Sequence, residues 1–324
     1  MTDPIRWGVL GAANFAKEHM APAIHAARGA RLAALATTSP DKAAGFQAFC
    51  PDLRIHDNYD ALLADPDIDA VYIPLPNHLH VEWVKKTLNA GKHVLCEKPI
   101  AMKAVEIDDL IALRDKTGLI AAEAYMIVHH PQWQRASVLY AEGAIGRLHL
   151  VDGVFSYDNR SDPGNIRNRP ETGGGSLPDI GVYTFGSARF VTGEEPVTVQ
   201  AKIRRENGVD VFAHVTADFP TFRYSSVTSM RLAKRQEMVF HGTEGVMRLT
   251  CPFNSGVFGQ AELTLERDGM SVTTERWPGV NQYVLQVENF GRSVRDGAHY
   301  LCPLEFSKGT QAMIDMAFDA EAKI

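Results

Sequence analysis

The first 122 residues alternate short apolar runs with segments of helical periodicity. Apolar runs occur at 5–12 (IRWGVLGA), 30–37 (ARLAALAT), 69–76 (DAVYIPLP), 93–99 (HVLCEKP) and 119–125 (LIAAEAY). Between them, segments such as 14–27, 79–91 and 104–118 repeat apolar residues at helical spacing. Near-continuous apolar strands separated by helices are typical of a parallel sheet covered on both faces. The pattern therefore predicts an α/β domain of the doubly wound type with right-handed crossovers.

After about residue 145 the pattern changes to alternating, β-branched segments. Examples are 149–158 (HLVDGVFSYD), 209–219 (VDVFAHVTADF), 223–232 (RYSSVTSMRL) and 261–269 (AELTLERDG). Such segments, several joined by short turns, predict a mainly antiparallel sheet with one packed face. The last segment, 308–324, has helical periodicity. We expect a dinucleotide-binding domain at 1–122 and an α+β domain at 123–324, whose last helix can pack back on the first domain.

Composition and charge narrow the classes of function. The chain has 324 residues, which suits two domains, with 45% hydrophobic and 22% charged residues and a net charge of -6. It has no basic arm that would favour nucleic acid and no positive surplus that would favour anionic membranes. It also lacks a long apolar span and an export-signal pattern, and its four cysteines are scattered. We therefore expect a cytoplasmic protein with reduced thiols.

A glycine turn follows the first strand, in the sequence GVLGAANFA. The dinucleotide fingerprint G-x-G-x-x-G/A falls on Gly11, Ala13 and Ala16, so its second glycine is replaced. A helix that starts here would present N–H groups and its positive dipole end to a pyrophosphate. We expect a Rossmann domain that binds a cofactor through Gly11, Ala12, Ala13, Asn14 and Phe15. The alternative is a glycine needed only for helix–strand packing.

The end of the second strand bears on the choice of cofactor. NAD enzymes typically have an acidic residue there, about 20 residues past the glycines. This chain has Thr37, Thr38 and Ser39, followed by Lys42. Hydroxyls and an ammonium group favour a 2'-phosphate, so NADP is expected and NAD remains possible. The same residues also predict a helix start, with Ser39 as N-cap and Pro40 at the first helical position.

Two later strands end in polar residues at the edge where ligands bind in doubly wound sheets. One strand leads into Glu97, Lys98 and Pro99, either an ion pair at the rim or a catalytic group. An earlier strand leads into Leu75, Pro76 and Asn77, which we expect to line the cofactor cleft, with His80 nearby. No third ligand accompanies His78 and His80 at convincing spacing, so we expect a structural role for them and no metal.

Residues 173–183 read GGGSLPDIGVY and allow two interpretations. Ser176 and Asp179 form an S-x-x-D capping pair, which predicts an ordinary helix start. Asp179 and Tyr183 are also one helical turn apart, so they can point to the same side as parts of an active site.

Polar residues before and between these motifs are candidates for substrate binding. The loop at 156–175 is rich in Gly, Asn and Arg, and Asn165, Arg167 and Arg169 could donate hydrogen bonds to sugar hydroxyls. We expect Tyr125 and Met126 at the end of the last strand of the first domain, with His130 after them, near the nicotinamide and the substrate pocket; Met126 is a candidate for cofactor binding. The alternative is a solvated surface loop for Asn165, Arg167 and Arg169, and packing for Tyr125, Met126 and His130.

Together, the turn at Gly11, the EKP at 97–99, the EAYMIVHHP at 123–131 and the GGGSLPDIGVY segment resemble the Gfo/Idh/MocA oxidoreductases over essentially the whole chain. The resemblance is closest to the branch of NADP-dependent D-xylose 1-dehydrogenases and dimeric dihydrodiol dehydrogenases. It implies a C-terminal domain on an open sheet, and a homodimer or homotetramer that forms through that sheet. It also implies that Lys98 and Tyr183 form the catalytic pair. Inositol dehydrogenases of the family have histidine at the position of Tyr183.

The expected reaction is hydride transfer between nicotinamide and a carbon of a sugar or polyol. A tyrosine needs a nearby cation to act as a base near neutral pH, because its ordinary pKa is about 10. We therefore expect Tyr183 to transfer the proton, Lys98 to favour its ionised form, and Asp179 to orient its neighbours. Alternatives are an NAD-dependent inositol-type dehydrogenase, a reductase of an anhydrosugar or diketone, and a non-catalytic cofactor sensor.

Overall fold

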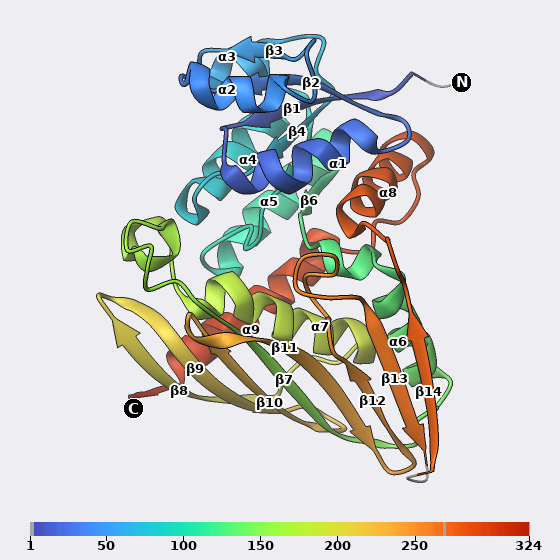
Figure 1. The fold of residues 1–324 in the computed structure, drawn as a ribbon. Coiled ribbons are helices and arrows are strands. Elements are labelled where there is room, and N and C mark those ends of the chain that lie inside the picture. The colour runs from blue at the N-terminus through green and yellow to red at the C-terminus, as the bar shows by residue number, and fades with distance from the viewer. Residues whose placement is uncertain (1–2, 268–269, 324) are drawn as a thin grey trace. The chain divides into compact units, whose positions relative to one another are not determined.

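The chain folds into two compact units (Figure 1). The structure is a computed structural model that describes residues 3–267 and 270–323. The first unit combines Met1–Ala101, Val105–His129 and Asn281–Lys308. The second unit combines Met102–Ala104, His130–Val280 and Gly309–Ile324. Residues 281–308 thus pack with the first unit, whereas the sequence places them in the second domain.

The first unit contains a six-stranded parallel sheet with strand order β3-β2-β1-β4-β5-β6. Its strands are β1 Ile5–Leu10, β2 Ala30–Ala36, β3 Arg54–His56, β4 Ala70–Ile73, β5 His93–Cys96 and β6 Ala121–Glu123. Its helices are η1 Ala16–Met20, α1 Ala21–Ala26, α2 Pro40–Gln47, α3 Tyr59–Ala64, η2 Asn77–Leu79, α4 His80–Asn89, α5 Ala104–Thr117, η3 Met126–His129 and α8 Gln282–Asp296. The predicted doubly wound Rossmann sheet is confirmed.

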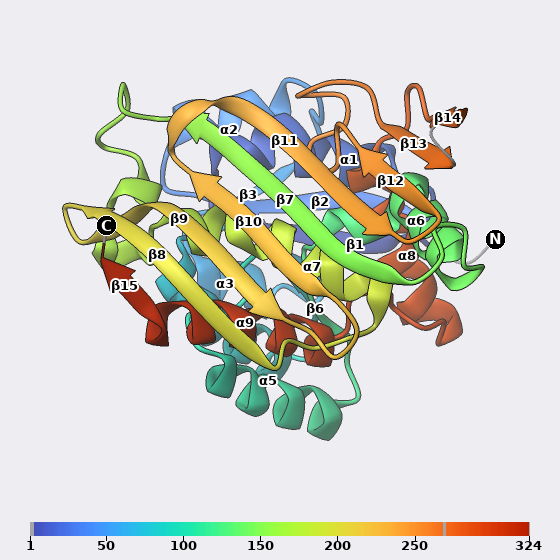
Figure 2. The ribbon, with the colours of Figure 1, turned by 90° about the horizontal axis from the view of Figure 1, so that it is seen from below.

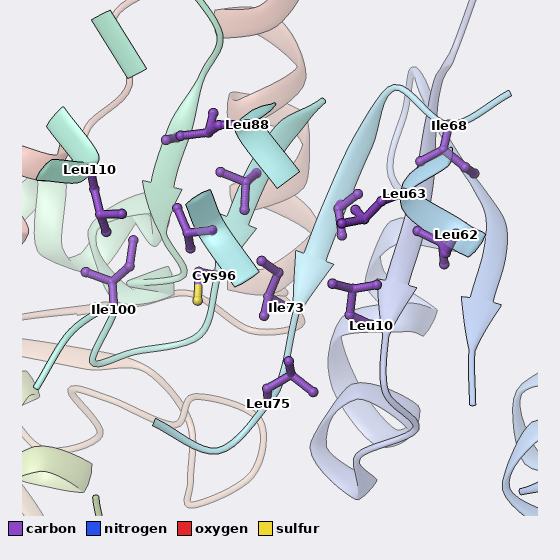
Figure 3. Packing of buried hydrophobic residues seen from close by; sticks show 14 of the residues in the cluster. Leu10, Leu62, Leu63, Ile68, Ile73, Leu75, Leu88, Cys96, Ile100 and Leu110 are labelled. Carbon is purple, nitrogen blue, oxygen red and sulfur yellow. The ribbon is translucent and has the colours of Figure 1, made fainter. Parts of the chain in front are cut away.

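Apolar side chains cover both faces of this sheet. On one face, Leu10 and Ile73 pack with Leu62 of α3, Leu88 of α4 and other aliphatic residues (Figure 3). On the other face, the fully buried ring of Trp7 lies 5.0 Å from the ring of Phe290 in α8. Burial on both faces explains why the strands read as continuous apolar runs.

The second unit contains a nine-stranded sheet with strand order β14-β13-β12-β11-β7-β10-β9-β8-β15. Its strands are β7 Leu148–Asp158, β8 Thr198–Glu206, β9 Val209–Asp218, β10 Arg223–Ser229, β11 Arg231–Gly242, β12 Gly245–Leu249, β13 Glu262–Arg267, β14 Ser271–Arg276 and β15 Glu321–Lys323. Its helices are α6 Pro131–Ala141, η4 Ile166–Asn168, η5 Pro170–Thr172, η6 Leu177–Gly181, α7 Val182–Thr192 and, from Gly309 on, α9 Leu304–Asp319. Only β7 with β10 and β8 with β15 pair in parallel among the described strands of this sheet, so the predicted mainly antiparallel sheet is confirmed.

The two faces of this sheet differ in burial. Along β9, Val211, Ala213 and Val215 are buried, while Phe212 and His214 are half-buried. Figure 2 shows α7 and α9 behind the sheet, with the opposite face of β11, β7, β10, β9 and β8 turned to the viewer. The alternation of the sequence therefore reflects one helix-covered face and one open face.

The C-terminal segment differs from the expectation. Helix α9 begins at Leu304 and ends at Asp319, and the residues after it form β15, which pairs in parallel with β8. The helical periodicity assigned to 308–324 therefore extends too far. No helix within residues 3–267 and 270–323 has the length and apolar character needed to cross a membrane.

Candidate functional site

The glycine turn of the first unit needs glycine at position 11. Gly11 has a φ of +93°, and its N–H donates to the carbonyl oxygen of Ala36 at 3.0 Å. A Cβ atom there would lie 3.1 Å from both Leu75 Cδ2 and the hydroxyl oxygen of Tyr59. Residues 12, 13 and 15 are half-buried, Asn14 is exposed, and the helix begins at Asn14. The predicted strand–turn–helix unit is therefore present, and Tyr59 packs against it, a contact that the sequence pattern did not indicate.

The residues after β2 form a helix start, as predicted. The Ser39 hydroxyl accepts a hydrogen bond from the Lys42 N–H at 3.3 Å, and Pro40 is the first residue of α2. The side chains of Thr38 and Lys42 are exposed. An exposed ammonium group and hydroxyl beside a helix N-terminus suit a phosphate.

Glu97 and Lys98 follow β5, and Glu97 forms hydrogen bonds with residues of β4. The Glu97 N–H donates to the Ile73 carbonyl at 3.0 Å, and a Glu97 carboxylate oxygen accepts from the Tyr72 hydroxyl at 2.6 Å. Burial and then the Glu97 charge raise the pKa of Tyr72 well above its usual value, so Tyr72 remains a donor. The Lys98 N–H lies 3.3 Å from the second oxygen of Glu97. Tyr72 lies within an apolar run of the sequence, and that pattern does not indicate its hydrogen bond to Glu97.

His80 connects the loops after β4 and β5. It is fully buried, and its two ring nitrogens each lie 2.7 Å from a carbonyl oxygen, of Pro99 and of Leu75. Burial lowers the pKa of His80. His80 therefore fixes the edge that carries Leu75, Pro76 and Asn77 on one side and Lys98 on the other. Among the described residues, no group of three His, Cys, Asp or Glu side chains could hold a metal ion.

Helix α8 brings an aromatic residue to the glycine turn. The Tyr283 ring lies 5.7 Å from the Phe15 ring and 5.5 Å from the His19 ring. The Asn281 side chain caps α8 by accepting from the N–H of Tyr283 at 3.0 Å. Helix α8 was not identified from the sequence, although its buried residues Tyr283, Val287 and Phe290 recur at helical spacing.

In the second unit, Asp179 binds two side chains from other segments. One oxygen accepts from the Tyr157 hydroxyl of β7 at 2.6 Å, and the other lies 2.9 Å from Nε of Arg167. Asp179 is buried, and its charge raises the pKa of Arg167. Arg167 is thus an ion-pair partner of Asp179, and its role as a donor to substrate stays a prediction.

Tyr183 lies one turn after Asp179, against an aromatic stack. Its ring is 5.8 Å from Phe155 and 5.6 Å from Phe253, and Phe155 stacks on Phe253 at 5.0 Å. The Trp133 ring also stacks with Phe253, and its Nε1 donates to the Pro252 carbonyl at 2.7 Å. These aromatic contacts hold the Tyr183 ring within the second unit.

The glycines before Tyr183 allow close packing, and the helix start is held from another strand. Ser176 does not cap η6; its hydroxyl donates to Asp210 of β9 at 2.8 Å, and the Leu177 N–H donates to the same oxygen at 2.7 Å. The predicted S-x-x-D capping pair is therefore wrong, because Asp210 accepts from this helix start. Gly175 has a φ of +133° and packs against the Asp210 carboxylate, and Gly174 packs against the Arg167 carbonyl.

The remaining candidates differ in burial and in their contacts. Strand β6 ends at Glu123, so Tyr125 and Met126 follow the strand and do not end it; both are buried in the first unit. His130 is the N-cap of α6 and accepts from the Gln132 N–H at 3.1 Å; burial lowers its pKa to about 4. Asn165 accepts from the Arg167 N–H at 3.0 Å, and Arg169 is exposed.

The doubly wound sheet with its glycine turn defines a dinucleotide-binding protein with a second, sheet-based unit. Comparison with known families agrees: the model for the oxidoreductase family with an NAD-binding Rossmann fold matches residues 5–125, and the model for the GFO/IDH/MocA C-terminal domain matches residues 133–248. The chain belongs to the Gfo/Idh/MocA oxidoreductase family and is an NAD(P)-dependent oxidoreductase.

Relatives span the whole chain. An uncharacterized oxidoreductase, ORF334, of Rhizobium meliloti is 38% identical over 97% of this chain and 96% of its own length. D-xylose 1-dehydrogenase (NADP(+)) 2 of Haloferax volcanii is 32% identical over 97% of this chain and 96% of its own. The structure resembles KijD10, a 3-ketoreductase from Actinomadura kijaniata in complex with NADP and TDP-benzene, with a TM-score of 0.90, 29% identity and 99% of each chain covered.

Proposed function

We propose that this protein is an NADP(H)-dependent oxidoreductase that moves a hydride between nicotinamide and a sugar or polyol carbon, as an aldose 1-dehydrogenase does. The turn at Gly11 carries the proposal, because its left-handed backbone makes the tight strand-to-helix turn of a dinucleotide-binding fingerprint. The similarity to a D-xylose 1-dehydrogenase supports the substrate class. The crystallised NADP complex of KijD10 supports the cofactor.

In this proposal Tyr183 is the proton-transfer residue. During oxidation the substrate carbon loses a hydride and its hydroxyl loses a proton, which leaves a carbonyl group. The bound nicotinamide supplies the hydride acceptor, and the Tyr183 oxygen takes the proton. Lys98 supplies a cation that favours the ionised tyrosine, and Asp179 orients its neighbours. In reduction the same tyrosine donates the proton.

An absorbance assay tests the function. The protein is mixed with NADP⁺ and, separately, D-xylose, D-glucose, D-galactose or myo-inositol, and reduced nicotinamide is followed. We expect turnover with an aldose and higher kcat/KM with NADP⁺ than with NAD⁺. Preference for myo-inositol with NAD⁺ would contradict the proposal, and a total lack of turnover in both directions would favour a sensor.

A second candidate is the reduction of a nucleotide-linked keto sugar. The whole-chain structural similarity to the 3-ketoreductase KijD10 favours it. Under this alternative, NADPH oxidation should require a dTDP-linked keto sugar, and a free aldose should give no turnover. The same assay, run in the reducing direction with both compounds, separates the two candidates.

Lys42 should control the preference for NADP. Lys42→Ala is expected to raise KM for NADP⁺ about tenfold and to leave KM for NAD⁺ unchanged, because only NADP⁺ carries the 2'-phosphate that the ammonium group would bind. Steady-state kinetics with both cofactors measures this. Lys116→Ala, an exposed lysine at the end of α5, is the control for net charge. Equal increases in KM for NADP⁺ and NAD⁺ would contradict a role of Lys42 in binding the 2'-phosphate.

We also propose that the open face of the second unit's sheet forms a homodimer, or a homotetramer built from it. Val227 of β10 and Val154 of β7 are paired neighbours on this face, and both are half-buried in the single chain. Val227→Glu should shift the sedimentation coefficient to that of a monomer, because it places a charge in an apolar contact. Val257→Glu, at a loop position that is 64% exposed, should leave the assembly intact. A monomeric wild-type protein would contradict the proposal.

A further inference from the structure

Arg167 is attached to the segment that carries Tyr183 by both its side chain and its main chain. Its Nε lies 2.9 Å from Asp179, one helical turn before Tyr183. Its carbonyl oxygen accepts from the Gly175 N–H at 3.0 Å, and Gly174 has no room for a Cβ against that carbonyl. The Arg167 N–H donates to the Asn165 side chain at 3.0 Å. The guanidinium group is therefore held in one place relative to Tyr183 within the second unit.

The charged groups near Tyr183 include cations and anions, so single substitutions can distinguish their effects. The Asp179 carboxylate is the largest influence that raises the pKa of Arg167, and Tyr157 and Tyr183 act in the same direction, so all three lie within electrostatic range of the guanidinium. Arg231 acts on Tyr157 and forms its own ion pair with Glu206 at 2.6 Å. The aromatic neighbours of the Tyr183 ring, Phe155 and Phe253, carry no charge.

We propose that Arg167 is a positioning residue that supplies a second cation, besides Lys98, to favour the ionised form of Tyr183. Asp179 and Tyr157 hold Arg167 in place, so Asp179 acts on Tyr183 through this ion pair. The inference rests on the proposed role of Tyr183 in proton transfer. This role of Arg167 differs from that of a sugar-binding donor, because Arg167 would act on Tyr183 even when no substrate is bound.

Loss of the Arg167 cation and loss of the Asp179 anion should affect the ionisation of Tyr183 in different directions. Arg167→Met leaves the Asp179 carboxylate without its cation, so ionisation of Tyr183 becomes harder. Asp179→Asn removes the negative charge of the pair, so it should not shift ionisation in the same direction. The double variant should fall between Arg167→Met and Asp179→Asn, because the two charges act as a pair.

Ultraviolet titration of the phenolate measures this without substrate. The Tyr183 signal is the difference between each protein and the same protein with Tyr183→Phe. We expect the Tyr183 transition of Arg167→Met to occur about one pH unit higher than that of the wild type, which corresponds to an approximately tenfold smaller phenolate fraction. Arg167→Lys should restore most of the wild-type value, and Arg169→Met, at the exposed arginine two residues on, should not move it.

Kinetics give an independent readout. With the best substrate of the sugar panel, the pH profile of kcat for Arg167→Met should shift in the same direction. A rise in KM for the sugar, with titration and pH profile both unmoved, would overturn the inference and assign Arg167 to substrate binding. If circular dichroism shows that Arg167→Met is unfolded, the phenolate titration of Tyr157→Phe tests the inference instead. This substitution removes a donor to Asp179 and should raise the transition by a smaller amount, and an unmoved transition overturns the inference.

The outcome for Arg167 can be distinguished from the outcome for the proposed function. Absence of turnover in the wild type, or normal turnover of Tyr183→Phe, would count against the proposed function. If the wild type is active and Tyr183→Phe is not, while Arg167→Met titrates like the wild type, only the inference about Arg167 fails.

Discussion

Phenylalanine in place of Tyr183 should lower kcat for alcohol oxidation by roughly 10²- to 10⁴-fold, the range that a positioned proton-transfer group contributes. The substitution removes the hydroxyl and keeps the ring, whose contacts with Phe155 and Phe253 set its position. The fold and the affinity for NADP should therefore stay close to those of the wild type. Initial rates of NADPH formation, with a fluorescence titration of NADPH binding, measure both quantities.

A second buried tyrosine in the same unit provides the matched control. Tyr224 of β10 is 1% exposed, and its ring packs against Phe185 and Phe219. Tyr224→Phe makes the same chemical change on strand β10, at a tyrosine with no proposed part in proton transfer, and should turn over substrate at nearly the wild-type rate. Near-normal kcat in Tyr183→Phe would exclude Tyr183 as the proton-transfer residue. Loss of activity in both variants would point to a general effect on the fold.

Sequence periodicity predicted the elements whose burial is regular along the chain. The strands of the first unit are buried on both faces and read as apolar runs, and β9 alternates because only one of its faces is covered. Helix α8 was not recognised. Its place is decided by contacts such as Phe290 with Trp7, which join residues far apart in the sequence.

Local sequence patterns identified the candidate site but could not identify its partners. The S-x-x-D pattern predicts that Ser176 caps its own helix, yet Ser176 binds Asp210, which lies 34 residues later. Asp179 was recognised from its spacing to Tyr183, while its contact with Tyr157 depends on β7. Likewise, nothing in an apolar run distinguishes Tyr72 from a packing residue. A pattern shows which residue could bind, and the tertiary fold decides which group it meets.

Asp210 should make the stability of the protein depend on pH in a defined direction. Its side chain is almost fully buried, and burial raises its pKa from 3.8 to about 6, although Leu177 and Ser176 donate to it. The folded state therefore binds this proton more tightly than the unfolded state does. The resulting stabilisation is present at low pH and is lost as the pH rises from about 4 to about 6.

Asp210→Asn removes this titration and can keep an acceptor for the Leu177 N–H. The unfolding free energy of the variant minus that of the wild type should increase by roughly 2–3 kcal/mol between pH 4 and pH 8, because one pKa unit corresponds to about 1.4 kcal/mol. Urea denaturation at a series of pH values measures the difference. Asp218→Asn, at the exposed end of the same strand, controls for the change in net charge. A difference that stays constant with pH would show that Asp210 ionises alike in the folded and unfolded chains. In that case, burial of the ionised Asp210 carboxylate would not destabilise the fold.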